Sequence, residues 1–319
     1  MRKQIKSLVL ATALTFGVGG VAQAQDLNVA FFLEWPTPNQ IAKVDKVYDE
    51  ALGVDVNWVD FSTGVAMTEA MLAGDIDISY SQGLAPFVTA IQQGAPIKMV
   101  GIAVVYEAND CFVHDNAGID ATNASELEGK TVAVPLNTMA DYSFRLQMAA
   151  LNVDIDTLTI VDQAPPDGAA SLVDEAVAMA CIFGGNSAKI AGEVGTPIMS
   201  TQQKADAGIG SFDVISVTES FATANPDLVR EFLEVTDEAN SDWRATPAQL
   251  RKVAQDAGMS VEDVQNTLKT FSFPSVREQR RDYFGRNGIA VQASESLGAV
   301  FDGSSNIELR RVIDGSFLR

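Results

Sequence analysis

Histidine is scarce in this sequence, and the short motifs of common enzyme classes are missing. There is one histidine, His114, with no cluster of Cys, His and carboxylates around it at metal-ligand spacing, so the sequence predicts no metal site. The G-x-S-x-G run of hydrolases is absent, and Gly184-Gly185 has no G-x-G-x-x-G pattern around it. General acid–base and dinucleotide chemistry are therefore hard to assemble, and we expect neither an enzyme nor a cofactor.

Basic residues are also few, with 22 Lys and Arg against 42 Asp and Glu, which gives a formal net charge of −20. A chain this acidic repels phosphate backbones and anionic lipid headgroups. The charge balance argues against nucleic acid and against an anionic membrane as partners. It is compatible with a freely diffusing, highly soluble protein, and we expect a monomer.

Long apolar runs are limited to one, Leu8–Val21, which follows the basic start Met1–Lys6 and precedes Ala22-Gln23-Ala24. This order is typical of a secretory signal peptide, here residues 1–24, with cleavage before Gln25. No later run reaches the roughly 20 apolar residues of a membrane span. No lipoprotein cysteine stands at the cleavage site. We therefore expect a soluble protein exported to the periplasm and not a membrane-anchored sensor.

Cysteine occurs twice, at Cys111 and Cys181, each within a strand-like run. In an exported protein two cysteines favour a disulfide, and neighbouring strands would place them within bridging distance. Two buried free thiols are the alternative.

Strand-like and helix-like segments alternate along most of the chain, which predicts an α/β fold of mostly parallel sheets flanked by helices. The alternation runs once through residues 26–105 and again through 127–183, and an extended segment returns at 211–217. Two such units joined by extended crossings make two lobes with a ligand cleft between them. We predict that residues 25–109 begin lobe 1, residues 110–213 form lobe 2, and residues 214–319 return to lobe 1 and add C-terminal helices.

Ligands of open α/β sheets bind beyond the carboxyl ends of the strands. Four loops occupy that position here, namely Glu34-Trp35, Ser62-Thr63-Gly64, Gln82–Ala85 and Asn137–Asp141. Three of them lead into predicted helices with a hydroxyl cap or a glycine, as Thr138 would cap the helix after it. Helix N-termini present free N–H groups and a positive dipole end, so they can hold a small anionic group without Lys or Arg.

Several runs resemble periplasmic substrate-binding proteins of ABC importers for taurine and other sulfonates. The resemblance covers most of the chain up to about Ala239, and its most specific run is L-x-G-K-x-V-A-V-P at Leu127–Pro135. Other matching runs are Ser62–Gly64, Ala73–Ile78, Gly83–Pro86, Tyr142-Ser143, Phe212–Val214 and Asn225–Val229. The resemblance implies a type II periplasmic-binding-protein fold, closure of two lobes around a ligand, and delivery to an inner-membrane permease.

A taurine-type zwitterion needs carboxylates and aromatic faces at its ammonium end and N–H donors at its sulfonate end. Asp213 looks like the family position whose carboxylate meets the taurine ammonium. Our candidate ligand-binding residues are Glu34, Trp35, Ser62, Thr63, Gln82, Gly83, Leu84, Asp110, Thr138, Met139, Asp141, Tyr142, Phe183, Asn186 and Asp213.

Other interpretations of these residues stay open. Asp141 stands where taurine-binding relatives carry a His, and its carboxylate fits a capping box with Thr138 equally well. Phe183 and Tyr142 fit core packing as well as ligand contact. The surplus of acids leaves a small cationic amine, guanidinium or a polyamine as an alternative ligand. An enzyme on the same fold, a lyase or synthase, is a further alternative.

Overall fold

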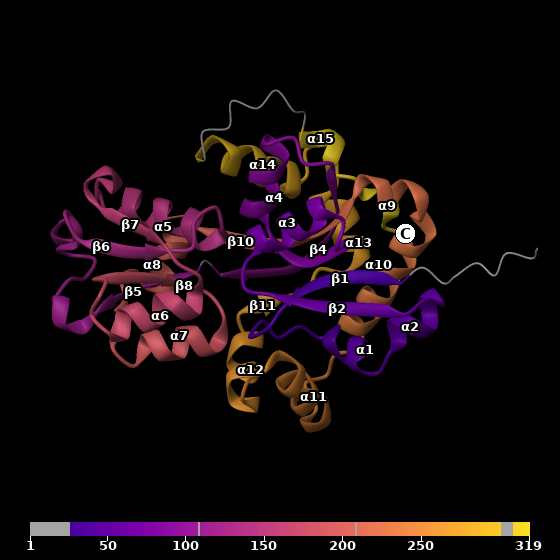
Figure 1. The fold of residues 1–319 in the computed structure, drawn as a ribbon, viewed down its shortest axis with the longest axis horizontal. Coiled ribbons are helices and arrows are strands. Elements are labelled where there is room, and N and C mark those ends of the chain that lie inside the picture. Colours follow the sequence, from indigo (N-terminus) through magenta and orange to yellow (C-terminus); the bar gives the residue numbers. More distant parts are fainter. Residues whose placement is uncertain (1–25, 108, 208, 301–308) are drawn as a thin grey trace, which may run out of the picture.

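The computed structural model describes residues 26–107, 109–207, 209–300 and 309–319, and it contains two β-sheets flanked by helices (Figure 1). The predicted signal peptide, residues 1–24, lies outside the described residues. The α/β fold with two lobes is confirmed. We call the part built on the six-stranded sheet lobe 1 and the part built on the five-stranded sheet lobe 2.

The lobe 1 sheet has the strand order β11-β4-β10-β3-β1-β2. Strands β1 and β3 near its centre are buried along almost their whole length, and in β3 this includes the polar residues Ser79, Ser81 and Gln82. The strands are β1 (Leu27–Phe32), β2 (Val56–Phe61), β3 (Ile78–Gly83), β4 (Ile97–Glu107), β10 (Gly210–Thr218) and β11 (Phe271–Ser272).

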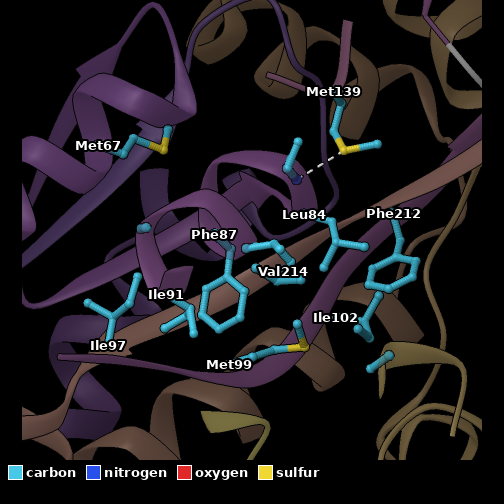
Figure 2. Packing of buried hydrophobic residues seen from close by; sticks show 14 of the residues in the cluster. Met67, Leu84, Phe87, Ile91, Ile97, Met99, Ile102, Met139, Phe212 and Val214 are labelled. Atoms are coloured by element: carbon cyan, nitrogen blue, oxygen red, sulfur yellow. Dashed lines mark hydrogen bonds between the residues drawn. The ribbon is translucent and has the colours of Figure 1, made fainter. Parts of the chain in front are cut away.

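Helices cover both faces of this sheet and form a hydrophobic core on each. On one face, Phe87 and Ile91 of α4 pack over Ile97 and Met99 of β4 (Figure 2). The helices of lobe 1 are α1 (Gln40–Val44), α2 (Val47–Leu52), α3 (Gly64–Ala73), α4 (Leu84–Gln92), α9 (Glu219–Ala224), α10 (Pro226–Ser241), α11 (Pro247–Ala257), α12 (Val261–Leu268), α13 (Val276–Glu278), α14 (Ile289–Val300) and α15 (Leu309–Val312).

Lobe 2 has the strand order β7-β6-β8-β5-β9. Its strands are β5 (Asp110–His114), β6 (Thr131–Val134), β7 (Thr159–Asp162), β8 (Met179–Ile182) and β9 (Gly195–Pro197). Its helices are α5 (Met139–Ala150), α6 (Pro165–Val173), α7 (Gly185–Gly192) and α8 (Thr201–Asp206). Short 3₁₀ or π turns lie at Asp115–Ala117, Ala124–Leu127, Ile155–Thr157, Gln279–Tyr283 and Gly315–Phe317.

The chain passes between the lobes twice, and each crossing explains a reversed strand. It leaves lobe 1 at the end of β4 and enters lobe 2 as β5, which runs antiparallel to β8. It returns after α8 as β10, which runs antiparallel to both β3 and β4. Near the first crossing, the Asn109 carbonyl accepts hydrogen bonds from Ser143 Oγ at 2.9 Å and Gln147 Nε2 at 3.1 Å, which ties the crossing to α5.

The predicted disulfide is confirmed. Cys111 on β5 lies directly opposite Cys181 on β8 in the antiparallel register, and their sulfurs are bonded. Among the described residues, no helix combines the length and the apolar character needed to cross a bilayer.

Candidate functional site

A pocket with an empty volume of about 320 Å³ lies between the lobes. The carboxyl ends of β1, β3 and β4 and the starts of α3, α4 and α5 meet there, as expected for an α/β sheet. The pocket is lined by Phe32, Trp35, Gly64, Gly83, Pro86, Tyr106, Asn109, Thr138, Met139, Phe183 and Asp213. Within the described part of the chain, none of these lining residues is Lys or Arg, and no group of residues could hold a metal ion.

The carboxylate at the base of the pocket belongs to Asp213 on β10, which is 3% exposed. Ser81 Oγ donates a hydrogen bond to Oδ2 at 2.9 Å, and the Tyr106 hydroxyl donates to Oδ1 at 2.9 Å. Trp35 Nε1 donates in turn to Ser81 Oγ at 3.0 Å. Burial raises the pKa of Asp213 to about 7, although the hydrogen bonds from Ser81 and Tyr106 act in the opposite direction.

Aromatic rings surround this carboxylate. Trp35 meets Tyr106 edge-on with the ring centroids 5.0 Å apart, and it lies 4.7 Å from the ring of Phe271. Across the pocket, Phe32 of lobe 1 and Phe183 of lobe 2 have centroids 6.0 Å apart. A buried carboxylate within aromatic walls attracts a small organic cation through both charge pairing and the ring quadrupoles.

Three helix starts also contribute to the pocket. Gly64 begins α3, Gly83 precedes α4, and Met139 begins α5, and all three line the pocket. A Cβ on Gly64 would lie 2.6 Å from Pro86 Cγ, so only glycine allows α3 and α4 to approach this closely. The three N-termini bring positive dipole ends to a region without basic side chains.

The Met139 side chain already occupies one of these helix starts. Its sulfur accepts a hydrogen bond from the Ala85 N–H of α4 at 3.1 Å (Figure 2, dashed line). Because Met139 belongs to lobe 2 and α4 to lobe 1, this contact also bridges the lobes. The thioether, a weak acceptor, therefore stands where an anionic ligand group would meet α4.

Three residues other than glycine adopt left-handed backbone conformations around the cleft. They are Glu34 (φ 58°), Ser81 (φ 64°) and Asn137 (φ 59°). Such conformations cost free energy in L-residues and tend to cluster at binding sites. At Ser81 the left-handed conformation accompanies the hydroxyl contact to Asp213.

The structure brings six of the predicted ligand-binding residues into the pocket. These are Trp35, Gly83, Thr138, Met139, Phe183 and Asp213. Glu34 and Ser62 line an adjoining opening with an empty volume of about 550 Å³, which Phe32 and Phe183 separate from the pocket. Thr63 caps α3 through the Ala66 N–H, and Leu84 starts α4 while its side chain packs in the core.

Gln82, Asp110 and Asp141 lie outside the pocket, for local reasons. Gln82 is fully buried on the other side of β3, where it bonds to the hydroxyls of Thr68 and Ser216. Asp110 forms an ion pair with Lys204.

Asp141 accepts from the Asn137 N–H at 2.9 Å and from Arg145 Nε at 2.8 Å, so it closes the turn before α5, as the capping interpretation holds. The backbone N–H that donates to the Asp141 carboxylate is that of Asn137 and not that of Thr138. Burial is the largest influence on the Asp141 pKa and raises it. Two further candidates also lie elsewhere, since Tyr142 packs against the lobe 1 core and Asn186 bonds to Glu34.

Five lining residues were not among the candidates, namely Phe32, Gly64, Pro86, Tyr106 and Asn109. Ser81, which bonds to Asp213, and Phe271, which packs against Trp35, were not among them either. Tyr106 stands near the end of β4, so the rule of strand carboxyl ends could have found it. Gln82 was selected in place of its neighbour Ser81. Successive residues of a strand point to opposite faces of the sheet, and Ser81 is the one of the two that bonds to Asp213. Phe271 lies in the two-residue strand β11, for which the sequence offers no local signal.

The raised pKa of Asp213 predicts a pH-dependent stability of the ligand-free protein. The folded state binds a proton up to about pH 7, whereas the ordinary carboxyl value is 3.8. Between these values the native state holds more protons, so the free energy of unfolding falls as pH rises, by about 1.4 kcal/mol per pH unit at most. Urea unfolding of wild type and Asp213→Asn from pH 4 to 8 measures this. A constant difference between the two proteins would contradict it.

Comparisons with known proteins agree with this architecture. The taurine-binding periplasmic protein of Escherichia coli (strain K12) is 25% identical over 293 residues, which are 88% of this chain and 88% of that protein. The structure of the alkanesulfonate-binding protein SsuA from Xanthomonas axonopodis pv. citri, bound to MOPS, superposes with a TM-score of 0.69 at 17% identity and covers 92% of this chain and 96% of that one.

The periplasmic aliphatic sulphonate binding protein SsuA from Escherichia coli superposes with a TM-score of 0.67 at 18% identity, over 91% of this chain and 97% of that one. At such identities the two structures show a common fold. All three relatives are named as binding proteins, in line with the expectation that this chain is not an enzyme. The family model described as NMT1/THI5 like matches residues 41–250, about two thirds of the chain, and the protein belongs to that family.

Proposed function

We propose that this protein is the periplasmic substrate-binding component of an ABC importer and that it captures taurine in the pocket between its lobes. The observation that carries the proposal is the polarity of the pocket. It has a buried carboxylate among aromatic rings, and the N-termini of three helices line the same pocket. A zwitterion with an ammonium and a sulfonate separated by two methylenes matches these two kinds of group.

The ammonium group would lie against Asp213. Its hydrogens would bond to the carboxylate oxygens, and its positive charge would face Trp35 and Tyr106, whose rings lie beside the carboxylate. Burial strengthens the pairing, since the site has little water to compete for the charge. The Tyr106 hydroxyl keeps its proton, because burial and the nearby Asp213 charge raise its pKa, and so it remains a donor to the carboxylate.

The sulfonate group would lie at the helix starts. The backbone around Gly64, Gly83 and Thr138 offers N–H groups and dipole ends to its three oxygens. A strong acid such as a sulfonate stays ionised at every physiological pH and needs no cationic partner to do so. The absence of Lys and Arg among the described lining residues is therefore compatible with an anionic end.

The partners follow from the proposed class. Lobes that close over a small ligand present it to a membrane permease, and the leader-like residues 1–24 fit export to the periplasm. The curated relative from Escherichia coli is a periplasmic protein by name, which supports the same location.

A second candidate ligand is a small cation without an acidic end. The Met139 sulfur on the Ala85 N–H favours it, because this contact fills part of the space that a sulfonate would need. An alkylamine or a guanidinium would use Asp213 and the aromatic walls and leave Met139 in place.

A thermal-shift screen followed by calorimetry separates these ligands. Taurine, hypotaurine, ethanesulfonate, ethylamine, guanidinium and putrescine are compared on the mature protein. A ligand at 100 times its Kd stabilises the fold by about 2.7 kcal/mol, which is readily detected. Stabilisation by taurine, with ethanesulfonate and ethylamine both inactive, supports the zwitterion. Stabilisation by ethylamine or guanidinium with taurine inactive replaces it with a cation site.

Replacing Met139 by Ala is expected to change the preferred ligand length. The variant frees the Ala85 N–H and enlarges the pocket at the sulfonate end. One methylene in a pocket contributes about 1–3 kcal/mol to discrimination, so preference should shift about tenfold from taurine towards 3-aminopropanesulfonate. Calorimetry with both ligands measures the ratio.

The matched control is Met139→Leu, which keeps a similar volume but has no acceptor. It should retain the preference for taurine. An equal shift in both variants would show that the sulfur, and not the space, governs ligand length.

A further inference from the structure

Glu34 reaches from lobe 1 to the start of helix α7 in lobe 2. Its Oε1 accepts a hydrogen bond from Asn186 Nδ2 at 3.1 Å, and its Oε2 accepts from the Ser187 N–H at 3.3 Å. Its backbone carbonyl accepts from the Gly185 N–H at 3.2 Å. One residue thus satisfies two backbone donors of a helix that belongs to the other lobe.

Helix α7 cannot make this cap for itself. Its N-cap residue is Gly184, which has no side chain, whereas α3 and α5 are capped locally by Thr63 and Thr138. Free N–H groups at a helix start are stabilised by a carboxylate, which also interacts favourably with the positive end of the dipole. The cap of α7 therefore exists only while Glu34 of the opposite lobe lies against it.

The end of α11 and the connection to α12 accept hydrogen bonds from Glu34 and from its partner Asn186. The Glu34 N–H donates to the Ala257 carbonyl at 2.8 Å, and Asn186 Nδ2 donates to the Gly258 carbonyl at 3.2 Å. Helix α11 is fixed to lobe 1 by the ion pair of Lys43 with Asp256 at 2.9 Å. In Figure 1, α11 and α12 lie below the lobe 1 sheet, and α12 is the nearer of the two to lobe 2.

The pair Gly184-Gly185, which fits no nucleotide motif, is explained by this contact. A Cβ on Gly184 would lie 3.1 Å from Glu34 Oε2, and a Cβ on Gly185 would lie 2.1 Å from Met259 Cε. Both neighbours belong to lobe 1. Gly184 also has a φ of 88°, which L-residues rarely adopt. Gly184 is therefore required by its backbone conformation, and a side chain at Gly185 would have to displace the Met259 methyl where the lobes approach each other.

Glu34 lies beside the pocket and not in it. It lines the adjoining opening together with Gly184 and Ser187, and Phe32 and Phe183 stand between that opening and Asp213. A change at Glu34 can therefore alter closure without altering a ligand contact.

We propose that Glu34 is a positioning residue that latches the two lobes by capping α7 and so sets how slowly a bound ligand leaves. Opening separates the carboxylate from α7, so that Ser187 and Gly185 lose their acceptors and must bond to water. The link to ligand release rests on the proposed function, whereas the latch itself is defined by contacts within the protein.

Hydrogen exchange of the full chain tests the latch without a ligand. In Glu34→Ala the amides of Gly185 and Ser187 should exchange about tenfold faster than in wild type, while the amides of α5 stay unchanged. The exposed Glu69→Gln on α3 is the control and should leave exchange as in wild type. Equal exchange rates at Ser187 in wild type and Glu34→Ala would overturn the latch, whether or not the protein binds taurine.

Stopped-flow kinetics with taurine tests the consequence. Glu34→Ala should raise the dissociation rate about tenfold with little change in the association rate, and by the same factor for taurine and hypotaurine. Factors that differ between the two ligands would show that Glu34 touches the ligand, and would overturn its role as a positioning residue. If wild type binds no taurine, the proposed function fails, and the exchange comparison still decides the latch.

A second variant approaches the latch from lobe 2. Gly185→Ala should displace Met259 and accelerate exchange at Ser187 in the same direction as Glu34→Ala, although Glu34 is intact. Adding Met259→Ala removes the steric conflict and should restore wild-type exchange, a coupling that a double-mutant cycle measures. If Met259→Ala gives no rescue, the approach of the lobes at Gly185 is not part of the latch.

Discussion

Asp213→Asn should weaken taurine binding by about 1.5–3 kcal/mol at pH 8, roughly ten- to a hundredfold in Kd. The substitution keeps the shape of the side chain and a hydrogen-bonding group for Ser81 and Tyr106, but it removes the negative charge that would pair with the ammonium. None of the other described lining residues is an Asp or a Glu, so none of them can supply that charge. Calorimetry at pH 8 measures the difference.

The effect of Asp213→Asn should also depend on pH. With its pKa raised to about 7, Asp213 is mostly protonated at pH 5 in the free protein. An ammonium ligand must then displace a proton, so wild-type affinity falls by up to about tenfold per unit below pH 7. The variant has no such proton, and the two affinities should converge towards pH 5. Calorimetry in two buffers of different ionisation enthalpy would detect the released proton in wild type alone.

The control for this experiment is Asp75→Asn, which changes an exposed carboxylate in the loop before β3. It should bind taurine as wild type does at both pH values. If folded Asp213→Asn also binds as wild type at pH 8, the ammonium does not lie at Asp213 and the orientation of the ligand must be revised.

Features of local sequence were predictable. The alternation of apolar strands with capped helices gave the α/β class, and the helix starts at Gly64, Leu84 and Met139 surround the pocket as the rule of strand carboxyl ends requires. The disulfide followed from two cysteines in strand-like runs. For the strands and helices the signal lies within each segment, whereas the disulfide was inferred from the presence of two cysteines in a chain expected to be exported.

Features that depend on contacts between distant segments were not predictable. The aromatic walls need Tyr106 of β4 and Phe271 of β11 side by side, and only the folded sheet pairs these two residues. The left-handed conformation of Lys46, which separates α1 from α2, is likewise not marked by a glycine in the sequence. Glu34 was predicted to contact the ligand from its loop position, and its hydrogen bond with Ser187 of α7 depends on the approach of lobe 2, which the local sequence does not encode.

Removing the disulfide should give the other large effect, on stability and not on binding. Cys111 and Cys181 close a loop with a sequence separation of 70, which contains β6, α5, β7 and α6 of lobe 2. On the chain-entropy account, a loop of this length contributes about 4 kcal/mol by restricting the unfolded state. The double variant Cys111→Ala/Cys181→Ala should therefore unfold at a clearly lower urea concentration. Neither cysteine lines the pocket, so its affinity for taurine should stay within about twofold.

The distribution of tryptophan allows the loss to be assigned to one lobe. All three tryptophans belong to lobe 1, at Trp35, Trp58 and Trp243, so their fluorescence reports that lobe, whereas far-ultraviolet circular dichroism reports both. Because the bridge joins β5 to β8 within lobe 2, the dichroism transition of the double variant should precede the fluorescence transition, while in wild type the two coincide. Coincident transitions at the wild-type midpoint would mean that the bridge adds nothing to stability. Coincident transitions at a lowered midpoint would mean instead that the lobes unfold as one cooperative unit, with the contacts of Glu34 and Met139 transmitting the loss from lobe 2 to lobe 1.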